Sequence, residues 1–186
     1  MENFKQPAAG ADPYDRNARR TRPDVATPAR AAAVAVEDQI RGLRDFEIGV
    51  FFDATGRELA RFHGNADQVS IPIPWLASMK GNIFTHNHPA GGTFSVEDIQ
   101  QAVQYKLGEI RAVSSHFRHA ASGFDAVWHG AVAVAYHESV QILREFVSAK
   151  VRNDEISAAN FTAELQHQAW SAVARQLQFK YWRERS

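Results

Sequence analysis

Two histidines, a serine and an aspartate lie close together in residues 84–98, FTHNHPAGGTFSVED, and these residue types could form a metal site. Successive side chains of an extended segment point to opposite faces, so His86 and His88 face the same way and can bind one ion. Asp98 is expected to supply a third ligand through an oxygen atom. The chain has no cysteine, so a transition metal here must be bound by imidazole and carboxylate groups.

The end of this segment also matches the start of a helix, a purely structural role that needs no metal or catalysis. Ser95 suits the N-cap, and Asp98 falls at the third helical position, where it completes a capping box. This interpretation explains both residues, but it leaves the paired histidines unexplained. The two interpretations are compatible, because side chains in a first helical turn lean back toward the N-terminus and would point Asp98 at the histidines.

The pattern resembles the JAB/MPN metalloproteases, also called JAMM, whose signature is a glutamate on an upstream strand, then HxHP, a short loop and SxxD. The HNHP form is similar to the bacterial branch that includes RadC-type proteins and JAB-like domains associated with phage head proteins. The resemblance extends over about residues 36–115 and rests on His86, His88, Pro89, Ser95 and Asp98. The loop of six residues, 89–94, is one residue shorter than is usual in the family.

The resemblance implies a zinc-dependent hydrolase of peptide or isopeptide bonds, with Zn(2+) bound by His86, His88 and Asp98. Such a ligand set leaves one tetrahedral position for a water, whose pKa falls toward about 7. Glu47 corresponds to the family glutamate and would be the general base. Ser95 would donate a hydrogen bond to the oxyanion. Substrates implied by the resemblance are proteins or peptides, including ubiquitin-like or other C-terminal tails.

Several alternatives stay open beside this expectation. Glu47 could instead be an exposed strand residue beside Arg44 or Arg57. The domain could be a catalytically inactive JAB-like binding or assembly module in a phage structural context, which the shortened loop favours. A metal-dependent nuclease is suggested superficially by the letters HNH and by the likeness to a family named for DNA repair. A second ion between His116 and His119 is a further alternative.

Composition limits the class of protein. At 186 residues and 45% hydrophobic content, the chain can bury one ordinary core. Lys plus Arg equals Asp plus Glu at 21 each, so no net field attracts nucleic acid or an anionic membrane. No apolar run is long enough to cross a bilayer, and the N-terminus has no signal-peptide pattern, so a cytoplasmic protein is expected. The sequence leaves a homo-oligomer open.

The expected fold class is mixed α+β, with a JAB/MPN-like (cytidine-deaminase-like) sheet flanked by helices. Three regions are expected: a flexible tail over residues 1–26, the metal-binding domain over residues 27–135, and a helical extension over residues 136–186 packed on the same domain. Apolar periodicity and turn residues predict the elements within them. Expected strands cover residues 45–52, 57–64, 82–85, 110–115 and 124–130. Expected helices cover residues 27–44, 75–81, 95–107, 137–151 and 161–178, the last continuing toward residue 186.

Overall fold

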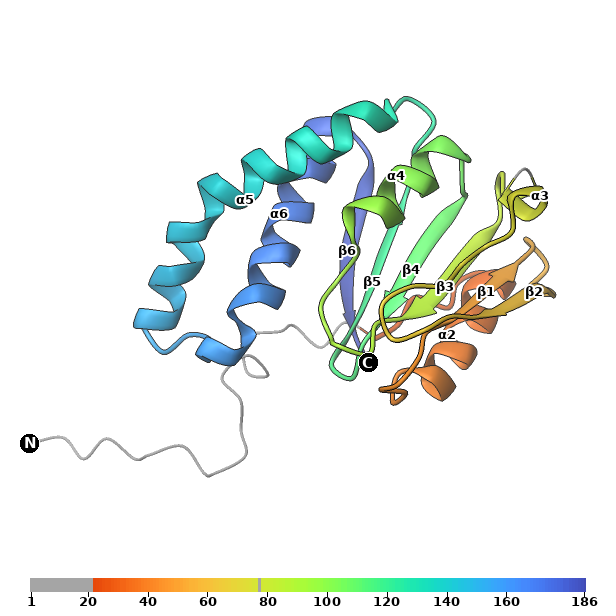
Figure 1. Ribbon diagram of the computed structural model, residues 1–186, viewed down its shortest axis with the longest axis horizontal. Coiled ribbons are helices and arrows are strands. Elements are labelled where there is room, and N and C mark those ends of the chain that lie inside the picture. Colours follow the sequence, from red (N-terminus) through yellow and green to blue (C-terminus); the bar gives the residue numbers. More distant parts are fainter. Residues whose placement is uncertain (1–21, 77) are drawn as a thin grey trace, which may run out of the picture.

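The computed structural model describes residues 22–76 and 78–186, which form one six-stranded mixed sheet with helices on both faces (Figure 1). The expected α+β fold class is confirmed. Most of the expected tail, residues 1–21, lies outside the described residues. The strands are β1 (Ile48–Phe52), β2 (Glu58–His63), β3 (Ile83–Asn87), β4 (Glu109–Val113), β5 (Phe117–Ser122) and β6 (Lys180–Arg185). The helices are α2 (Pro28–Ile40), α3 (Ile73–Leu76), α4 (Val96–Gln104), α5 (His129–Arg152), the 3-10 turn η1 (Ala158–Asn160) and α6 (Phe161–Leu177).

The sheet contains one parallel strand pair, β3 with β4, within the order β2-β1-β3-β4-β5-β6. The other neighbouring strands pair antiparallel. A parallel pair needs a crossover connection, and α4 provides it here. The carboxyl end of β3 therefore meets the N-terminus of α4, the place where ligands commonly bind in sheets of this kind.

Helices cover both faces of the sheet, so the central strands are buried on both sides. Val50 and Phe52 of β1 pack with α2 in one core cluster, whereas Phe51 packs in a second cluster with α4, α5 and α6. All five residues of β1 are buried. Alternating apolar residues thus predicted the strand, and the second layer of helices explains why its other face is also buried.

The start of α2 follows the expected capping pattern. The Thr27 hydroxyl accepts a hydrogen bond from the Arg30 backbone N–H at 3.2 Å, and Pro28 occupies the first helical position. The helix ends at Ile40, earlier than residue 44. Among the described helices, none combines the length and the apolar character that crossing a bilayer requires.

Two sequence-based assignments in the C-terminal half were wrong. Residues 124–128 form a loop, residues 129 and 130 begin α5, and the strand lies earlier, at Phe117–Ser122. The chain end is also a strand, not a continuation of α6. Gln178 adopts a left-handed conformation with φ of 62°, which ends the helix, and the aromatic residues that follow pair with β5.

The C-terminal segment is built into the same sheet as the rest of the chain. The expected boundary between residues 135 and 136 falls inside α5, which starts at His129. Helix α6 contributes Trp170 and Val173 to the larger core cluster, and β6 forms the edge of the sheet next to β5.

Candidate metal centre

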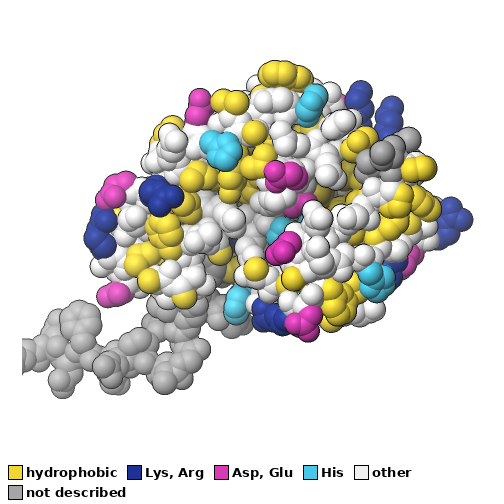
Figure 2. Space-filling view, in the orientation of Figure 1, with side chains coloured by type: hydrophobic (Ala, Val, Ile, Leu, Met, Phe, Trp, Pro, Cys, Tyr) yellow, Lys and Arg dark blue, Asp and Glu magenta, His cyan; other side chains and the backbone are white. Residues whose placement is uncertain are grey.

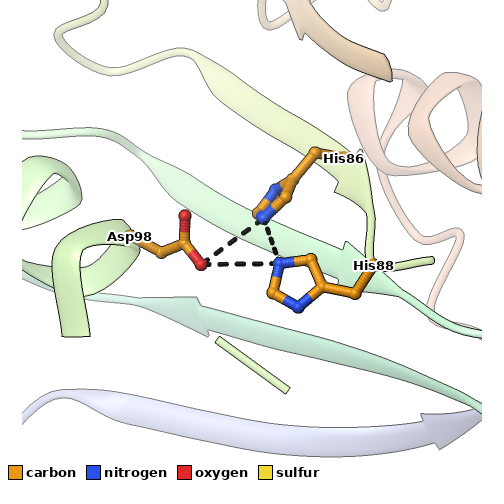
Figure 3. Close-up of side chains that lie close together, drawn as sticks. All are labelled: His86, His88 and Asp98. Carbon is orange, nitrogen blue, oxygen red and sulfur yellow. Dashed lines mark hydrogen bonds and ion pairs between the residues drawn. The ribbon is translucent and has the colours of Figure 1, made fainter. Parts of the chain in front are cut away.

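The two histidines and the aspartate come together at the carboxyl end of β3 (Figure 3). His86 belongs to β3, His88 follows that strand, and Asp98 lies in the first turn of α4. The two histidine Nε2 atoms are 2.7 Å apart, and Asp98 Oδ2 lies 3.5 Å from each of them. The structure therefore brings together all three residues that the sequence suggested as metal ligands.

This donor set fits a zinc ion in its chemistry and approximately in its geometry. The three ligand atoms lie within 4.8 Å of one another. Zinc bonds of about 2.0–2.1 Å place neighbouring tetrahedral ligand atoms about 3.3 Å apart, close to the two nitrogen–oxygen distances of 3.5 Å. The two nitrogens stand at a hydrogen-bonding distance of 2.7 Å, so they would have to separate by about half an ångström.

Asp98 faces the two histidines and also caps the N-terminus of α4. Its Oδ2 accepts a hydrogen bond from the Ser95 backbone N–H at 2.8 Å, and its own N–H donates to the Ser95 hydroxyl at 3.0 Å. The expected capping box is thus confirmed, and the capping oxygen is the one that faces both imidazoles. Burial opposes ionisation of Asp98, but His86 and His88 hold its pKa well below the usual range.

The short loop before α4 still reaches the site because two glycines turn the chain. Gly91 and Gly92 have φ of 77° and 105°, in the region that residues with a side chain rarely adopt. A Cβ atom on Gly92 would also lie 2.8 Å from Gln166 Oε1. The missing residue in this loop therefore does not move Asp98 away from the histidines.

The His86 ring is oriented by stacking. Its centroid lies 5.2 Å from that of Phe84 with an interplanar angle of 16°. His86 Nδ1 is buried and forms no hydrogen bond with any described residue. Packing against Phe84, without a hydrogen bond to Nδ1, thus orients the ring so that Nε2 faces Asp98 and His88.

Glu47 lies directly before β1 and lines the same cleft as His86, His88 and Asp98. It is 6% exposed, so the interpretation as an exposed strand residue is wrong. The two arginines named with it bind elsewhere: Arg57 pairs with Asp53, and Arg44 donates to the Pro89 carbonyl. Burial raises the pKa of Glu47 to about 7, helped by Asp98 and opposed by His88.

The cleft around these residues has a volume of about 460 Å³ and opens on the face shown in Figure 2, where a histidine lies in a recess between acidic side chains. Ser95, at the start of α4, also lines it. The Ser95 oxygen accepts the bond from the Asp98 N–H, and its hydroxyl hydrogen remains a donor. All five expected site residues therefore border one cleft.

The alternative of a second ion between His116 and His119 is not supported. His116 is exposed, whereas His119 is 3% exposed and its Nδ1 lies 2.9 Å from the Tyr181 hydroxyl. Within the described residues, His86, His88 and Asp98 are the one group of three or more candidate side chains with the spacing of a metal site.

The structure adds neighbours of the site that sequence reasoning missed. Gln166 of α6 lines the cleft, and Trp170 of the same helix bonds to the loop that precedes α4. Both lie more than 70 positions beyond the loop, and no local motif marks them.

No protein-family model, curated protein or solved structure significantly matches the chain. The case for a metal centre therefore depends on the distances, burial and chemistry of the residues themselves. The likeness to the JAB/MPN metalloproteases remains one of short motifs.

Proposed function

We propose that this protein is a zinc-dependent hydrolase of peptide or isopeptide bonds, of the kind that the HxHP and SxxD motifs resemble. One observation carries the proposal: two imidazoles and a carboxylate converge within 4.8 Å in a cleft that also contains the buried Glu47. Structural sites close the coordination of a zinc ion with protein ligands, whereas catalytic sites use three and leave a position for substrate. Three ligands beside an acid–base group match the catalytic kind.

The chain's own residues would divide the work of hydrolysis. Zinc, when bound, would act as a Lewis acid and make a water acidic enough to attack at neutral pH. The Glu47 carboxylate would accept the proton of that water and pass it to the nitrogen of the leaving amine. A general acid–base group works best when its pKa is close to the operating pH. Burial raises the pKa of Glu47 to about 7 in the metal-free protein, and a bound cation would lower it from there.

Ser95 would stabilise the developing negative charge on the substrate carbonyl oxygen. Its hydroxyl oxygen is fixed by the Asp98 N–H, so the remaining O–H has a restricted set of directions in the cleft. A donor of this kind acts on the transition state more than on the ground state. The open cleft suits a protein or peptide chain as the substrate.

The first test measures metal and hydrolysis in the same preparation. Protein purified without chelators should contain about one zinc ion per chain and cleave some member of a panel of linear and isopeptide-linked fluorogenic peptides. Glu47→Gln should retain the zinc and lose hydrolysis, whereas His88→Ala should lose both. Glu138→Gln, which removes an exposed carboxylate on α5, is the matched control and should change neither.

Each other outcome selects another function. Zinc without hydrolysis of any peptide favours a binding or assembly module with a structural metal, and the absence of zinc favours a module without one. Metal-dependent nicking of plasmid DNA that His88→Ala abolishes would support a nuclease. Continued turnover by Glu47→Gln would remove Glu47 from the mechanism.

A further inference from the structure

The loop of residues 89–95, called the site loop below, joins His88 to the helix that carries Asp98. Its conformation therefore sets the distance between the histidines and the carboxylate. The N-terminal end of the site loop is fixed near the sheet, where the His88 backbone N–H donates to the Val113 carbonyl at 2.9 Å. The Arg44 guanidinium donates to the Pro89 carbonyl at 3.2 Å. The other end contacts elements from the C-terminal part of the chain.

The strongest of these contacts comes from Trp170 in α6. Its indole N–H donates to the Phe94 carbonyl at 2.9 Å, and both residues are buried, at 0% and 1% exposure. A buried indole N–H and a buried carbonyl both need partners, and here each satisfies the other. Phe94 directly precedes Ser95, the N-cap of α4, so this bond fixes the position where the helix begins.

Two further side chains hold the middle of the site loop. Gln166 Oε1 accepts from the Thr93 backbone N–H at 3.4 Å and fills the space beside Gly92. The Tyr181 hydroxyl of β6 lies 3.4 Å from the Thr93 hydroxyl. Thr93 is 3% exposed, so these contacts lie out of bulk water.

Tyr181 is itself held in place. Its hydroxyl lies 2.9 Å from His119 Nδ1 and 3.0 Å from His167 Nδ1. Burial lowers the pKa of His167 to about 3 and holds that of His119 well below its usual range, so both rings stay neutral at physiological pH. A neutral imidazole has one donor and one acceptor nitrogen, which allows both rings to bond the same hydroxyl.

We propose that Trp170, Gln166 and Tyr181 are positioning residues that hold the site loop and thereby set the distance between Asp98 and the two histidines. This inference rests on the metal centre of the proposed function. It gives α6 and β6 the role of holding the site loop. Side chains that orient metal ligands from outside typically change metal affinity by about 10–100-fold when they are removed.

The test compares two tryptophan variants. Trp170→Phe removes the indole N–H that bonds to the site loop and should weaken zinc binding by about 10–100-fold. Trp182→Phe removes an indole N–H that donates to Glu184 at 2.8 Å, away from the cleft, and should leave zinc affinity unchanged. Both variants remove one indole donor from the C-terminal segment. Trp170 is fully buried whereas Trp182 is half-buried, so Trp170→Phe should lose more stability, and positioning must be measured separately from stability.

Two readouts separate positioning from stability. The visible spectrum of the Co(II) form reports ligand geometry, and it should change in Trp170→Phe but not in Trp182→Phe. Amide hydrogen exchange of the metal-free protein should increase at Thr93 and Ser95 in Trp170→Phe. Unchanged affinity, spectrum and exchange in Trp170→Phe would overturn the inference.

The exchange readout also keeps this inference distinct from the proposed function. If the wild type binds no zinc, the metal centre is wrong, and faster exchange in the site loop of Trp170→Phe would still show that Trp170 holds the loop. If Trp170→Phe does not fold, Tyr181→Phe and Gln166→Ala take its place. Wild-type zinc affinity and wild-type loop exchange in both would refute the role.

Discussion

Two regions that bury carboxylates differ in whether those carboxylates have arginine partners. On the α2 side of the sheet, the Arg111 guanidinium lies 2.7–2.9 Å from the carboxylates of Glu37, Glu109 and Glu184. Arg118 adds a second contact to Glu37 at 2.8 Å. We call these five residues the charge network. Each of its buried carboxylates has an arginine partner.

The cleft has the opposite character. Glu47 and Asp98 share it with two imidazoles, and no described Lys or Arg side chain lines it. His86 and His88 face Asp98, whereas Glu47 is buried and no described Lys or Arg pairs with it. Burial of such a carboxylate is costly. The charge network stabilises the fold, and the contrast supports the proposal that the cleft receives a cation.

The largest expected effect tests the charge network. Arg111→Met leaves three buried carboxylates without their shared partner and should lower the free energy of unfolding by about 3–5 kcal/mol. Urea unfolding measures this loss. Arg41→Met removes an exposed contact of 3.9 Å to Asp38 and should cost less than about 1 kcal/mol. Similar losses for the two variants would contradict the comparison.

The next prediction concerns Glu47, the buried carboxylate of the cleft that has no arginine partner, in the metal-free protein. The pKa of Glu47 is about 7 in the folded protein and 4.5 as its ordinary value. Between pH 4.5 and 7, the Glu47 carboxyl therefore holds a proton in the folded protein and has released it in the unfolded chain. The stability of the protein should therefore fall as pH rises from about 4.5 to 7. Glu47→Gln should remove up to about 3 kcal/mol of this dependence. Parallel stability curves for both proteins would show that Glu47 titrates normally.

The third prediction concerns the stability that the protein gains when zinc is added. Zinc at about 100 times its dissociation constant should raise the free energy of unfolding by about 2.7 kcal/mol, because it binds only the folded state. Thermal unfolding with and without zinc measures the gain. His88→Ala should abolish it, while Arg111→Met should retain it. An equal gain in His88→Ala would mean that zinc binds elsewhere.

The smallest effect measures what Ser95 contributes as the N-cap of α4, apart from its proposed role in hydrolysis. Ser95→Ala removes the side-chain acceptor for the Asp98 N–H and should cost about 1 kcal/mol of stability, whereas Ser95→Gly should cost only a few tenths. Chemical denaturation of the metal-free proteins measures both. Equal stability of the alanine variant and the wild type would show that the capping bond contributes nothing.

Local sequence patterns predicted the features that depend on a few neighbouring residues. The HxHP spacing and the capping box follow from strand alternation and helix-start geometry, and both operate within one or two turns of chain. The N-cap at Thr27 was predictable for the same reason. The position of Asp98 beside the histidines followed from its place in the first turn of the helix, where side chains lean back toward the N-terminus.

Features that depend on distant pairing were missed. Residues 179–186 carry a pattern that suits a helix end, and only the free edge of β5 makes them a strand. The charge network joins Arg111 to Glu37 and Glu184, which are 74 and 73 positions away. No periodicity relates such residues, so tertiary packing alone brings them together.

A single oxygen, Asp98 Oδ2, closes the first turn of α4 and also faces both imidazoles, which couples two equilibria that are usually separate. Fraying of that turn would withdraw a ligand, and departure of the ion would in turn loosen the turn. Thermodynamic linkage makes the two effects equal: the free energy by which a bound ion would stabilise the first turn of α4 equals the free energy by which the formed turn would strengthen ion binding. Ion binding would therefore also stabilise the packing of α4 on the core, which Ile99 and Val103 of this helix join.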